Sequence, residues 1–318
     1  MRIARLSICL LALGFGACSS SEVREERLEP ISTVDTGPRA DDKLDAVAWT
    51  QAAAEFRAAS LQAFAGAWRA VDTGVADPAW DALPPAERDA LGNRAGLASL
   101  PIAVIADVDE TLLENTPFNA RMIVEPIPGD LAVADSRAAF TRRWKHWVAD
   151  ERARALPGAA AFARRLSEGG VAFYYITNRD DDERDATCRN LVAEGFPVSN
   201  CETFVLTRNE AEGRPSAKLS RRAAVGRAHR VLAVLGDNLG DFVDGVDASR
   251  AIRDGLVDQH SGWWGERWWM LPNPMYGSWE NPAAPLPPDV VPTTVGERSA
   301  AVRKAKIAEL DLRQDGEQ

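Results

Sequence analysis

Several motifs that mark common enzyme classes are missing from this 318-residue chain, and two metal-binding residue types are scarce. It contains four cysteines and three histidines, with no C-x-x-C pair and no arginine-histidine-glycine motif. A zinc site of clustered Cys and His ligands is therefore not expected, and neither is a histidine nucleophile. No G-x4-G-K-[ST] loop occurs, which argues against a P-loop nucleotide hydrolase.

A surplus of basic residues and a long hydrophobic run are also missing. The formal net charge is -10 and the pI is about 5.0, which argues against a surface that binds the phosphate backbone of a nucleic acid. No nucleic-acid partner is expected. The chain is 46% hydrophobic and 26% charged, close to the averages of globular proteins. We therefore expect a folded body rather than a disordered chain or a multispan membrane protein.

The N-terminus has the pattern of a secretory signal peptide over residues 1–17, with Arg2 and Arg5 before an apolar stretch and small residues after it. The stretch is shorter than the roughly 20 residues that a membrane span needs. Residues 15–18, Phe-Gly-Ala-Cys, resemble the lipobox of bacterial lipoproteins, which predicts a lipid anchor on Cys18. We therefore expect a lipid-anchored protein of the bacterial cell envelope, held at the outer membrane, with residues 18–42 as a flexible tether.

Two cysteines, Cys188 and Cys201, lie outside the signal peptide and its cleavage point. In an oxidising envelope they can form a disulfide. Two buried thiols are the alternative, and the sequence leaves both open.

The order of apolar segments predicts an α/β fold. Between Ala46 and Val71 apolar residues recur at steps of three and four, the period of an amphipathic helix, and a second helix is expected over residues 85–91. From residue 102 onward, short apolar runs alternate with helical stretches, as in a parallel sheet with crossover helices. The predicted strands are 102–106, 171–176, 204–206 and 231–235.

Polar clusters follow three of these strands: Asp107 and Asp109 after the first, Thr177 to Arg179 after the second, and Asp237 and Asp241 after the fourth. In an open parallel sheet, ligands bind at the carboxyl ends of the strands. Neighbouring carboxylates repel one another unless a proton or a cation lies between them. Oxygen ligands favour a hard divalent ion, and Mg²⁺ suits a few carboxylates with water and a substrate phosphate. The alternative for any single Asp is a structural role, as a helix cap or in a turn.

The motif order strengthens the case for a phosphate site. D-x-D-x-T-L at residues 107–112, then Thr177, Lys218 and G-D-N-x-x-D at residues 236–241, resembles the haloacid dehalogenase (HAD) superfamily. Segments 106–115, 176–179, 236–242 and 271–277 are similar to those of class C acid phosphatases. The resemblance covers about residues 43–280. It implies a Rossmann-like core with a parallel sheet and a small helical cap, and hydrolysis of phosphomonoesters.

The resemblance also implies a division of the chain. A helical segment at 43–100 is expected to contribute to the cap, and the core is expected over 101–280 with a cap insert at about 115–155. The Pro-rich and helical tail, 281–318, has no assigned function. A homodimer is a further expectation from the family.

By the same resemblance, two aspartates share the chemistry. Asp107 is expected to attack phosphorus and form an aspartyl-phosphate, and Asp109 is expected to act as general acid and then as base. Mg²⁺ is expected between the carboxylates of Asp107 and Asp237 and the backbone carbonyl of Asp109, while Asp241 ligates it or orients a bound water.

Three further residues are expected to stabilise the transferred phosphoryl group. Thr177 and Asn178 can donate hydrogen bonds to its oxygens, and Lys218 can neutralise its charge. A solvated surface lysine is the alternative for Lys218.

Aromatic residues bear on the choice of substrate. In the resembling family, aromatic residues sandwich the base of nucleoside 5′-monophosphates, and positional matching points to Trp144 and Tyr276. Core packing is the alternative for both. A sugar-phosphate phosphatase or phosphotransferase, and an envelope ligand carrier of the haem-binding type, are the competing functions.

Other prominent residues receive structural interpretations or none. We expect Arg179 to pair with Asp180, Asp181 or Asp182. Arg221 and Arg222 could face solvent and are not assigned. The cluster of Trp263, Trp264, Trp268 and Trp269 is expected in the core or at a subunit interface.

Overall fold

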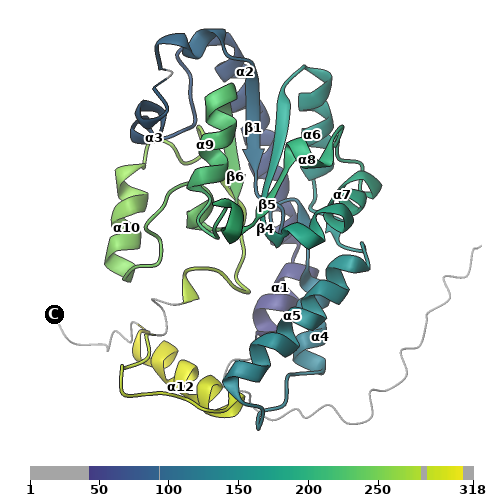
Figure 1. Ribbon diagram of the computed structural model, residues 1–318, viewed down its shortest axis with the longest axis vertical. Coiled ribbons are helices and arrows are strands. Elements are labelled where there is room, and N and C mark those ends of the chain that lie inside the picture. Colours follow the sequence, from purple (N-terminus) through teal and green to yellow (C-terminus); the bar gives the residue numbers. More distant parts are fainter. Residues whose placement is uncertain (1–42, 93, 281–284, 311–318) are drawn as a thin grey trace, which may run out of the picture. The chain divides into compact units, whose positions relative to one another are not determined.

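The computed structural model describes residues 43–92, 94–280 and 285–310 (Figure 1). The predicted signal peptide, Cys18 and the tether lie outside the described residues. Among the residues that are described, no helix is both long and apolar enough to cross a bilayer.

A five-stranded sheet forms the centre of the fold, in the order β5-β4-β1-β6-β7. Its strands are β1 (Ile102–Ala106), β4 (Ala172–Asp180), β5 (Val205–Arg208), β6 (Arg230–Gly236) and β7 (Trp268–Met270). Every neighbouring pair is parallel. The α/β fold with a parallel sheet, predicted from the sequence, is therefore confirmed.

Two hydrophobic layers cover the two faces of this sheet. One contains α2 (Ala54–Ala76), α6 (Ala159–Glu168) and α7 (Arg184–Ala193); the other contains α9 (Leu219–Ala228) and α10 (Arg250–Gln259), and α3 (Pro85–Ala90) packs on α9. Alternate residues of β1 explain this arrangement, because Val104 and Ala106 pack in the first layer and Ala103 and Ile105 in the second. A strand buried on both faces reads as a continuous apolar run.

Short elements complete the path of the chain: η1 (Arg94–Ser99), η2 (Asp181–Glu183), α8 (Cys201–Phe204), η3 (Glu210–Glu212) and η4 (Leu239–Asp241). The second predicted strand was expected to end at Ile176, yet β4 continues to Asp180 and pairs there with Arg208. Thr177 and Asn178 therefore lie inside β4, at the register shift between the Ile176–Leu206 and Asp180–Arg208 pairs, rather than in a free loop.

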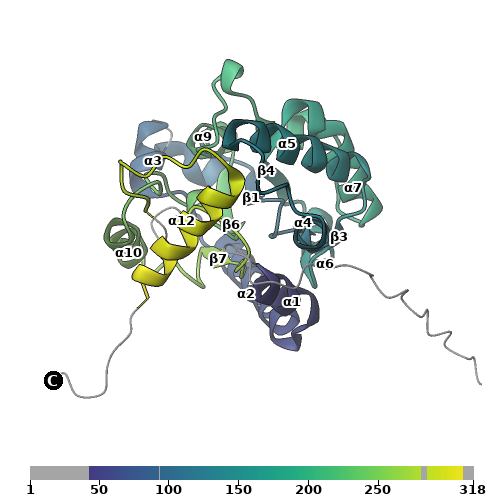
Figure 2. The same cartoon turned by 90° about the horizontal axis from the view of Figure 1, so that it is seen from below.

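A helical insert follows the first strand. The two-stranded ladder of β2 (Leu113–Glu114) and β3 (Arg154–Ala155) is antiparallel, so the chain leaves and rejoins the core at one place. Between them lie α4 (Thr116–Val124) and α5 (Val133–Ala149). Figures 1 and 2 show both helices at one end of the sheet. This insert occupies the segment predicted as the cap.

The N-terminal helix differs from the prediction. One amphipathic helix was expected over 46–71, but extended backbone at Ala53 (φ -77°, ψ 126°) separates α1 (Leu44–Ala52) from α2. Of the predicted apolar face, Phe56 and Ala63 in α2 are buried, whereas Trp49 in α1 is 39% exposed. Helix α1 lies against α4, and α2 packs on β6 and β7.

The tail contains α12 (Val295–Ala308), which agrees with the charged helix predicted there. Its N-terminal end pairs with the loop before α5: Val295 N–H donates to Leu131 O (2.9 Å), and Gly296 N–H donates to Gly129 O (2.8 Å). At its other end Lys306 pairs with Glu280 (3.2 Å). Helix α12 therefore connects the cap insert to the segment after β7.

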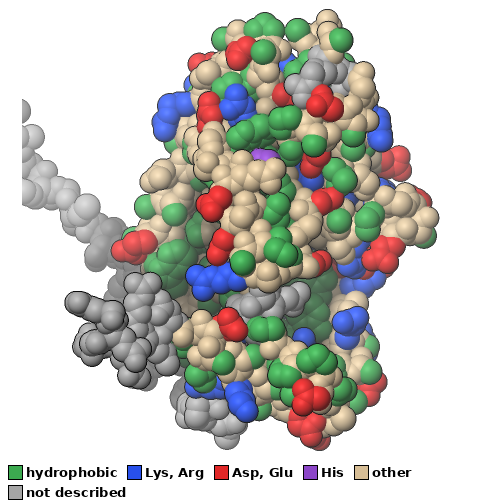
Figure 3. Space-filling view, turned by 90° about the vertical axis from the view of Figure 1, so that its left-hand side faces the viewer, with side chains coloured by type: hydrophobic (Ala, Val, Ile, Leu, Met, Phe, Trp, Pro, Cys, Tyr) green, Lys and Arg blue, Asp and Glu red, His purple; other side chains and the backbone are tan. Residues whose placement is uncertain are grey.

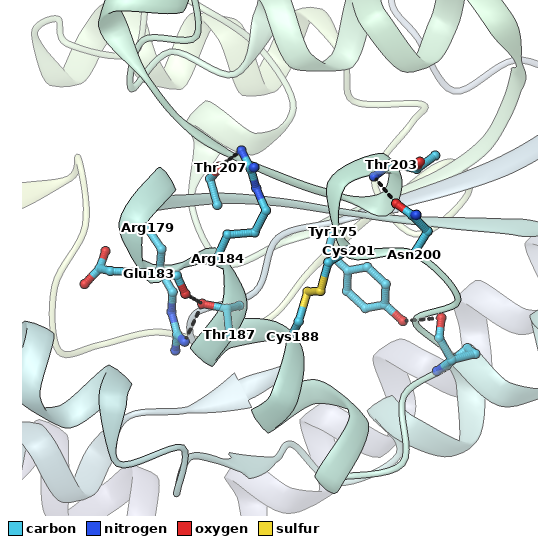
Figure 4. Close-up of a disulfide and its surroundings, with 11 residues drawn as sticks. Tyr175, Arg179, Glu183, Arg184, Thr187, Cys188, Asn200, Cys201, Thr203 and Thr207 are labelled. Atoms are coloured by element: carbon cyan, nitrogen blue, oxygen red, sulfur yellow. Dashed lines mark hydrogen bonds between the residues drawn. A yellow bond between two sulfur atoms is a disulfide. The ribbon is translucent and has the colours of Figure 1, made fainter.

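Cys188 of α7 and Cys201 of α8 form a disulfide, with their Cα atoms 6.1 Å apart (Figure 4). The question that the sequence left open is answered in favour of the bond. It joins the helix after β4 to the segment that leads into β5, beside Tyr175, whose hydroxyl donates to Pro197 O (3.2 Å).

Candidate active site

Three carboxylates converge at the carboxyl ends of two neighbouring strands. Asp107 follows β1, Asp237 follows β6, and Asp241 lies in the short helix η4 just beyond. Each offers an oxygen within 4.8 Å of the other two. The convergence arises because β1 and β6 are adjacent and parallel, so their ends meet at one edge of the sheet.

Local hydrogen bonds fix these side chains. Asp107 N–H donates to Leu235 O (2.9 Å), and the carboxylate of Asp241 accepts from the N–H of Asn238 (2.9 Å) in a capping box. The Thr111 hydroxyl lies 3.1 Å from a carboxylate oxygen of Asp237 and 3.4 Å from one of Asp107. The amide of Asn273 donates to the other oxygen of Asp237 (2.8 Å).

Lys218 lies between two of the carboxylates. Its Nζ contacts Oδ1 of Asp107 and lies 2.6 Å from Oδ1 of Asp241, and the residue is only 5% exposed. Burial opposes its charge, but attraction to Asp107 and Asp241 outweighs burial and raises the pKa of Lys218. The alternative of a solvated surface lysine is therefore wrong.

The cluster of Asp107, Asp237 and Asp241 carries more negative charge than Lys218 can neutralise. Burial raises the pKa of Asp107 to about 6; Asp241 adds to the rise and Lys218 opposes it. Burial, followed by repulsion from Asp107, raises the pKa of Asp237 well above its ordinary value. The cluster therefore favours added positive charge, and its oxygen donors suit a hard divalent cation. The residues present fit the predicted metal site.

We expect these shifts to make the metal-free protein less stable as the pH rises from about 4 to 7. Folded-state pKa values above the unfolded ones mean that the folded protein binds more protons in this window, so stability falls with increasing pH. For Asp107, whose pKa rises from 3.8 to about 6, the whole loss amounts to about 3 kcal/mol and is largest between pH 4 and 6. Thermal unfolding in a chelator should therefore show a steeper fall for wild type than for Asp107→Asn.

The same experiment includes its own metal control. Added Mg²⁺ should raise the melting temperature of wild type at pH 7, because a cation stabilises the ionised carboxylates. Equal pH slopes in the two proteins would contradict the raised pKa of Asp107.

Asp109 stands apart from this cluster. Its carboxylate is held by Arg179 Nη2 (2.8 Å), Asn115 Nδ2 (2.9 Å) and the Thr177 hydroxyl (3.3 Å). Its side chain is not in the group that can hold a cation together. Any part that Asp109 takes in metal binding therefore falls to its backbone.

The predicted pairing of Arg179 is wrong. Its guanidinium turns away from Asp180, Asp181 and Asp182 and forms a two-nitrogen contact with Asp109, while its Nη1 donates to Thr187 (3.1 Å, Figure 4). The three acidic residues pair elsewhere: Asp180 with Arg208, Asp181 with Arg184 and Arg214, and Asp182 with Lys145. Sequence neighbours on a strand point to opposite faces, which a charge count does not reveal.

No role was predicted for Asn115 from the sequence, although it contacts Asp109. Its amide nitrogen donates to both Asp109 (2.9 Å) and Glu110 (3.1 Å), and its amide oxygen accepts from the buried Trp147 (2.8 Å). Glu110 has a positive φ of 58°, a sharp turn directly after the D-x-D pair. This turn redirects the chain, and Asn115 then fixes the orientation of Asp109.

Thr177 and Asn178 lie at the end of β4, beside the acidic cluster. The Thr177 oxygen accepts from the N–H of Arg179 (3.1 Å), and its hydroxyl donates to Asp109 (3.3 Å), so it can donate to a phosphoryl oxygen only by leaving that carboxylate. Asn178 is exposed and borders the cavity described below, and its Oδ1 accepts from the buried Arg221 (2.7 Å). Both arginines that the sequence left unassigned are buried, Arg221 at 1% and Arg222 at 0% exposure.

A cavity of about 790 Å³ opens over these groups. Asp107, Asp109, Asp237, Lys218 and Asn178 lie on its wall together with aromatic residues of the cap insert. Trp144 lines it, edge-to-face against Phe118 (5.1 Å between ring centroids), and Tyr276 lines the wall contributed by the segment after β7. The structure thus brings both predicted aromatic residues to the cavity. In the tryptophan cluster, Trp268 is completely buried, and the other three are partly buried and pack against the core.

The molecular surface shows no broad basic area on the face drawn in Figure 3, where acidic and basic side chains of the described residues are interspersed. This distribution matches the acidic composition of the chain.

Comparisons with known proteins agree with this geometry. A family model described as "HAD superfamily, subfamily IIIB (Acid phosphatase)" matches residues 17–279. The class C acid phosphatase from Bacillus anthracis is 25% identical, with a TM-score of 0.67 over 86% of this chain and 99% of that chain. The same enzyme with tungstate bound is 26% identical, with a TM-score of 0.64 over the same shares.

Proposed function

Because the chain belongs to subfamily IIIB of the HAD superfamily, the acid phosphatases, and is a phosphomonoesterase, we propose that it is a Mg²⁺-dependent hydrolase of nucleoside 5′-monophosphates that works through an aspartyl-phosphate. The observation that carries this proposal is the convergence of Asp107, Asp237 and Asp241 within 4.8 Å beneath one cavity, with Lys218 between two of them.

Asp107, Asp237 and Asp241 are the side chains that would hold the metal, with the backbone carbonyl of Asp109. Bound there, a divalent cation neutralises charge so that a carboxylate can approach a phosphate. Mg²⁺ is our choice because it accepts a few carboxylates together with a substrate phosphate.

Asp107 is the proposed nucleophile. One of its carboxylate oxygens attacks phosphorus and the bond to the leaving oxygen breaks, which leaves an aspartyl-phosphate and the free alcohol. Asp109 gives its proton to that leaving oxygen. In the second half, Asp109 takes a proton from water, whose oxygen attacks phosphorus and releases Asp107 and inorganic phosphate.

The remaining polar groups surround the transferred phosphoryl group. Lys218, buried beside Asp107, supplies a fixed positive charge, and Thr177 and Asn178 supply hydrogen-bond donors. Preorganised donors of this kind stabilise the charge that develops in the transition state. The Bacillus anthracis enzyme is described with tungstate bound. Tungstate is a tetrahedral oxyanion like phosphate, which supports an oxyanion site here.

Metal removal tests the proposal directly. We expect chelator-treated protein to release no phosphate above background from an aryl phosphate at acidic pH, and Mg²⁺ to restore the activity. Restoration by Ca²⁺ or Zn²⁺ but not by Mg²⁺ would overturn the choice of metal. Absence of phosphate release with every divalent ion would overturn the proposed catalytic site.

Trp144 and Tyr276 support a nucleotide substrate, since they contribute aromatic rings from two different walls of the cavity. Stacking of a base on such a ring contributes roughly 1 to 3 kcal/mol to binding, as measured by replacing the aromatic residue with alanine. A sugar phosphate offers no aromatic face and gains nothing comparable.

We therefore expect Trp144→Ala to reduce kcat/KM for 5′-nucleotides about tenfold more than for a sugar phosphate. The ratio within each variant cancels any general loss of folded enzyme. Trp49→Ala, an exposed tryptophan outside the cavity, is the matched control and should leave the ratio unchanged. An equal loss on both substrate classes would favour the sugar-phosphate alternative.

A further inference from the structure

A buried arginine next to the proposed phosphate site forms no ion pair among the described residues. Arg221 is 1% exposed and donates only to neutral oxygens: the carbonyls of Thr177, Pro215 (2.8 Å) and Ser216 (3.2 Å), and the side chain of Asn178 (2.7 Å). Burial lowers the pKa of Arg221 to about 10, so its charge persists at physiological pH. A buried cation without a direct counter-ion is costly, so the acceptors that surround Arg221 must hold it in place.

The contacts of Arg221 join two parts of the site that are distant in sequence. Thr177 and Asn178 lie in the C-terminal part of β4, and Pro215 and Ser216 precede Lys218 at the start of α9. One guanidinium therefore holds the ends of both segments at a fixed separation. All the groups that we assign to the phosphoryl oxygens lie on these two segments.

The chemistry of the guanidinium also decides how Asn178 is oriented. Arginine has only donors, so the amide must present its oxygen to Arg221. The NH₂ group of Asn178 then points away from Arg221, and Asn178 borders the cavity. A donor is what an anionic phosphoryl group requires at that place.

We propose that Arg221 is a positioning residue of the phosphate site: it aims the Asn178 amide and the backbone before Lys218 at the transferred phosphoryl group without touching it. This inference rests on the proposed function. The tests below measure the binding of inorganic phosphate, so the inference about Arg221 can be contradicted independently of the proposed hydrolysis.

The main test uses Arg221→Lys, which keeps the charge but cannot reach all the acceptors. We expect the inhibition constant of inorganic phosphate to rise, and kcat to fall, about tenfold each, as a small misplacement of donors would cause. The double variant with Asn178→Ala should lose less than the sum of the two single losses, because both changes remove the contact between Arg221 and Asn178. Additive losses, or unchanged phosphate inhibition in folded Arg221→Lys, would overturn the proposal.

The chain offers a closely matched control in Arg230. It is 5% exposed and also donates to backbone carbonyls, those of Gly74 (2.8 Å), Asp77 (2.6 Å) and Trp80 (3.2 Å), at a distance from the cavity. Arg230→Lys should cost comparable stability and leave the affinity for phosphate unchanged. An equal loss of phosphate affinity in both variants would show that Arg221 is merely structural.

A second variant tests the orientation without altering Arg221. Asn178→Asp keeps the shape of the side chain and its acceptor for Arg221, but it replaces the NH₂ donor with a negative oxygen. We expect phosphate to bind at least tenfold more weakly to Asn178→Asp than to Asn178→Ala, measured by calorimetry with inorganic phosphate and Mg²⁺. Equal affinities would overturn the proposed orientation. If the wild-type protein binds phosphate but hydrolyses no ester, the proposed function is refuted and the inference about Arg221 is not.

Discussion

Asp107→Asn should abolish phosphate release, with a loss of roughly four orders of magnitude or more in kcat, as removal of a nucleophile typically causes. The amide that replaces the carboxylate is a poor nucleophile and a poor metal ligand. The same substitution removes the contact with Lys218 and one of three converging carboxylates. Release of phosphate from an aryl phosphate with saturating Mg²⁺ is the measurement.

Two comparisons keep this prediction specific. Asp258→Asn, an equivalent change on the exposed surface of α10, should retain full activity. Rapid quenching of wild type with labelled substrate should trap phosphate on the protein, whereas Asp107→Asn should trap none. Turnover close to wild type in Asp107→Asn would falsify the assignment of the nucleophile.

Gly236→Ala should impair the site almost as severely, although glycine carries no functional group. A Cβ at this position would overlap the side chain of Asp241, lying 2.6 Å from its Cγ. The carboxylate would have to leave Lys218 and the Asn238 N–H. We expect the Mg²⁺ concentration for half-maximal activity to rise about 100-fold, at the upper end of the effects seen when metal-site partners are displaced.

The stability cost of the same change should be modest by comparison. Overpacking a buried position costs typically about 1–3 kcal/mol, so Gly236→Ala should still fold at 25 °C. Gly255→Ala in α10 is the control, because a Cβ there meets no neighbour within 4 Å. A normal Mg²⁺ requirement in folded Gly236→Ala would show that Asp241 is dispensable for metal binding.

Four of the five strands of the central sheet, and the polar residues that follow them, were predictable because they depend on local pattern, whereas β7 was not predicted. The run 102–106 coincides with β1, and 231–235 lies within β6. Strands that are buried on both faces must be apolar throughout, and the polar residues that follow them mark their ends. The helix break at Ala53 was not predictable, since neither glycine nor proline signals it.

The partners of three polar residues could not be predicted from the sequence: those of Arg179, Arg221 and Asn115. Each is a polar residue whose partner lies across the fold: Asp109 for Arg179, the ends of two segments for Arg221, and Trp147 for Asn115. A charged residue in a sequence has many acidic or polar neighbours. Which of them it meets depends on the packing of elements, so local charge patterns pointed Arg179 to the wrong partners.

By itself, the sequence determined the class of fold, the edge of the sheet that carries the chemistry, and the aspartates at its centre. These follow from strand period and from the rule that parallel strands end at one edge. Tertiary structure alone decided that the side chain of Asp109 faces Arg179 rather than the carboxylate cluster, and that two unassigned arginines are buried. Backbone pattern sets where a residue lies along the chain, whereas the direction and partners of a side chain are fixed only when distant segments pack together.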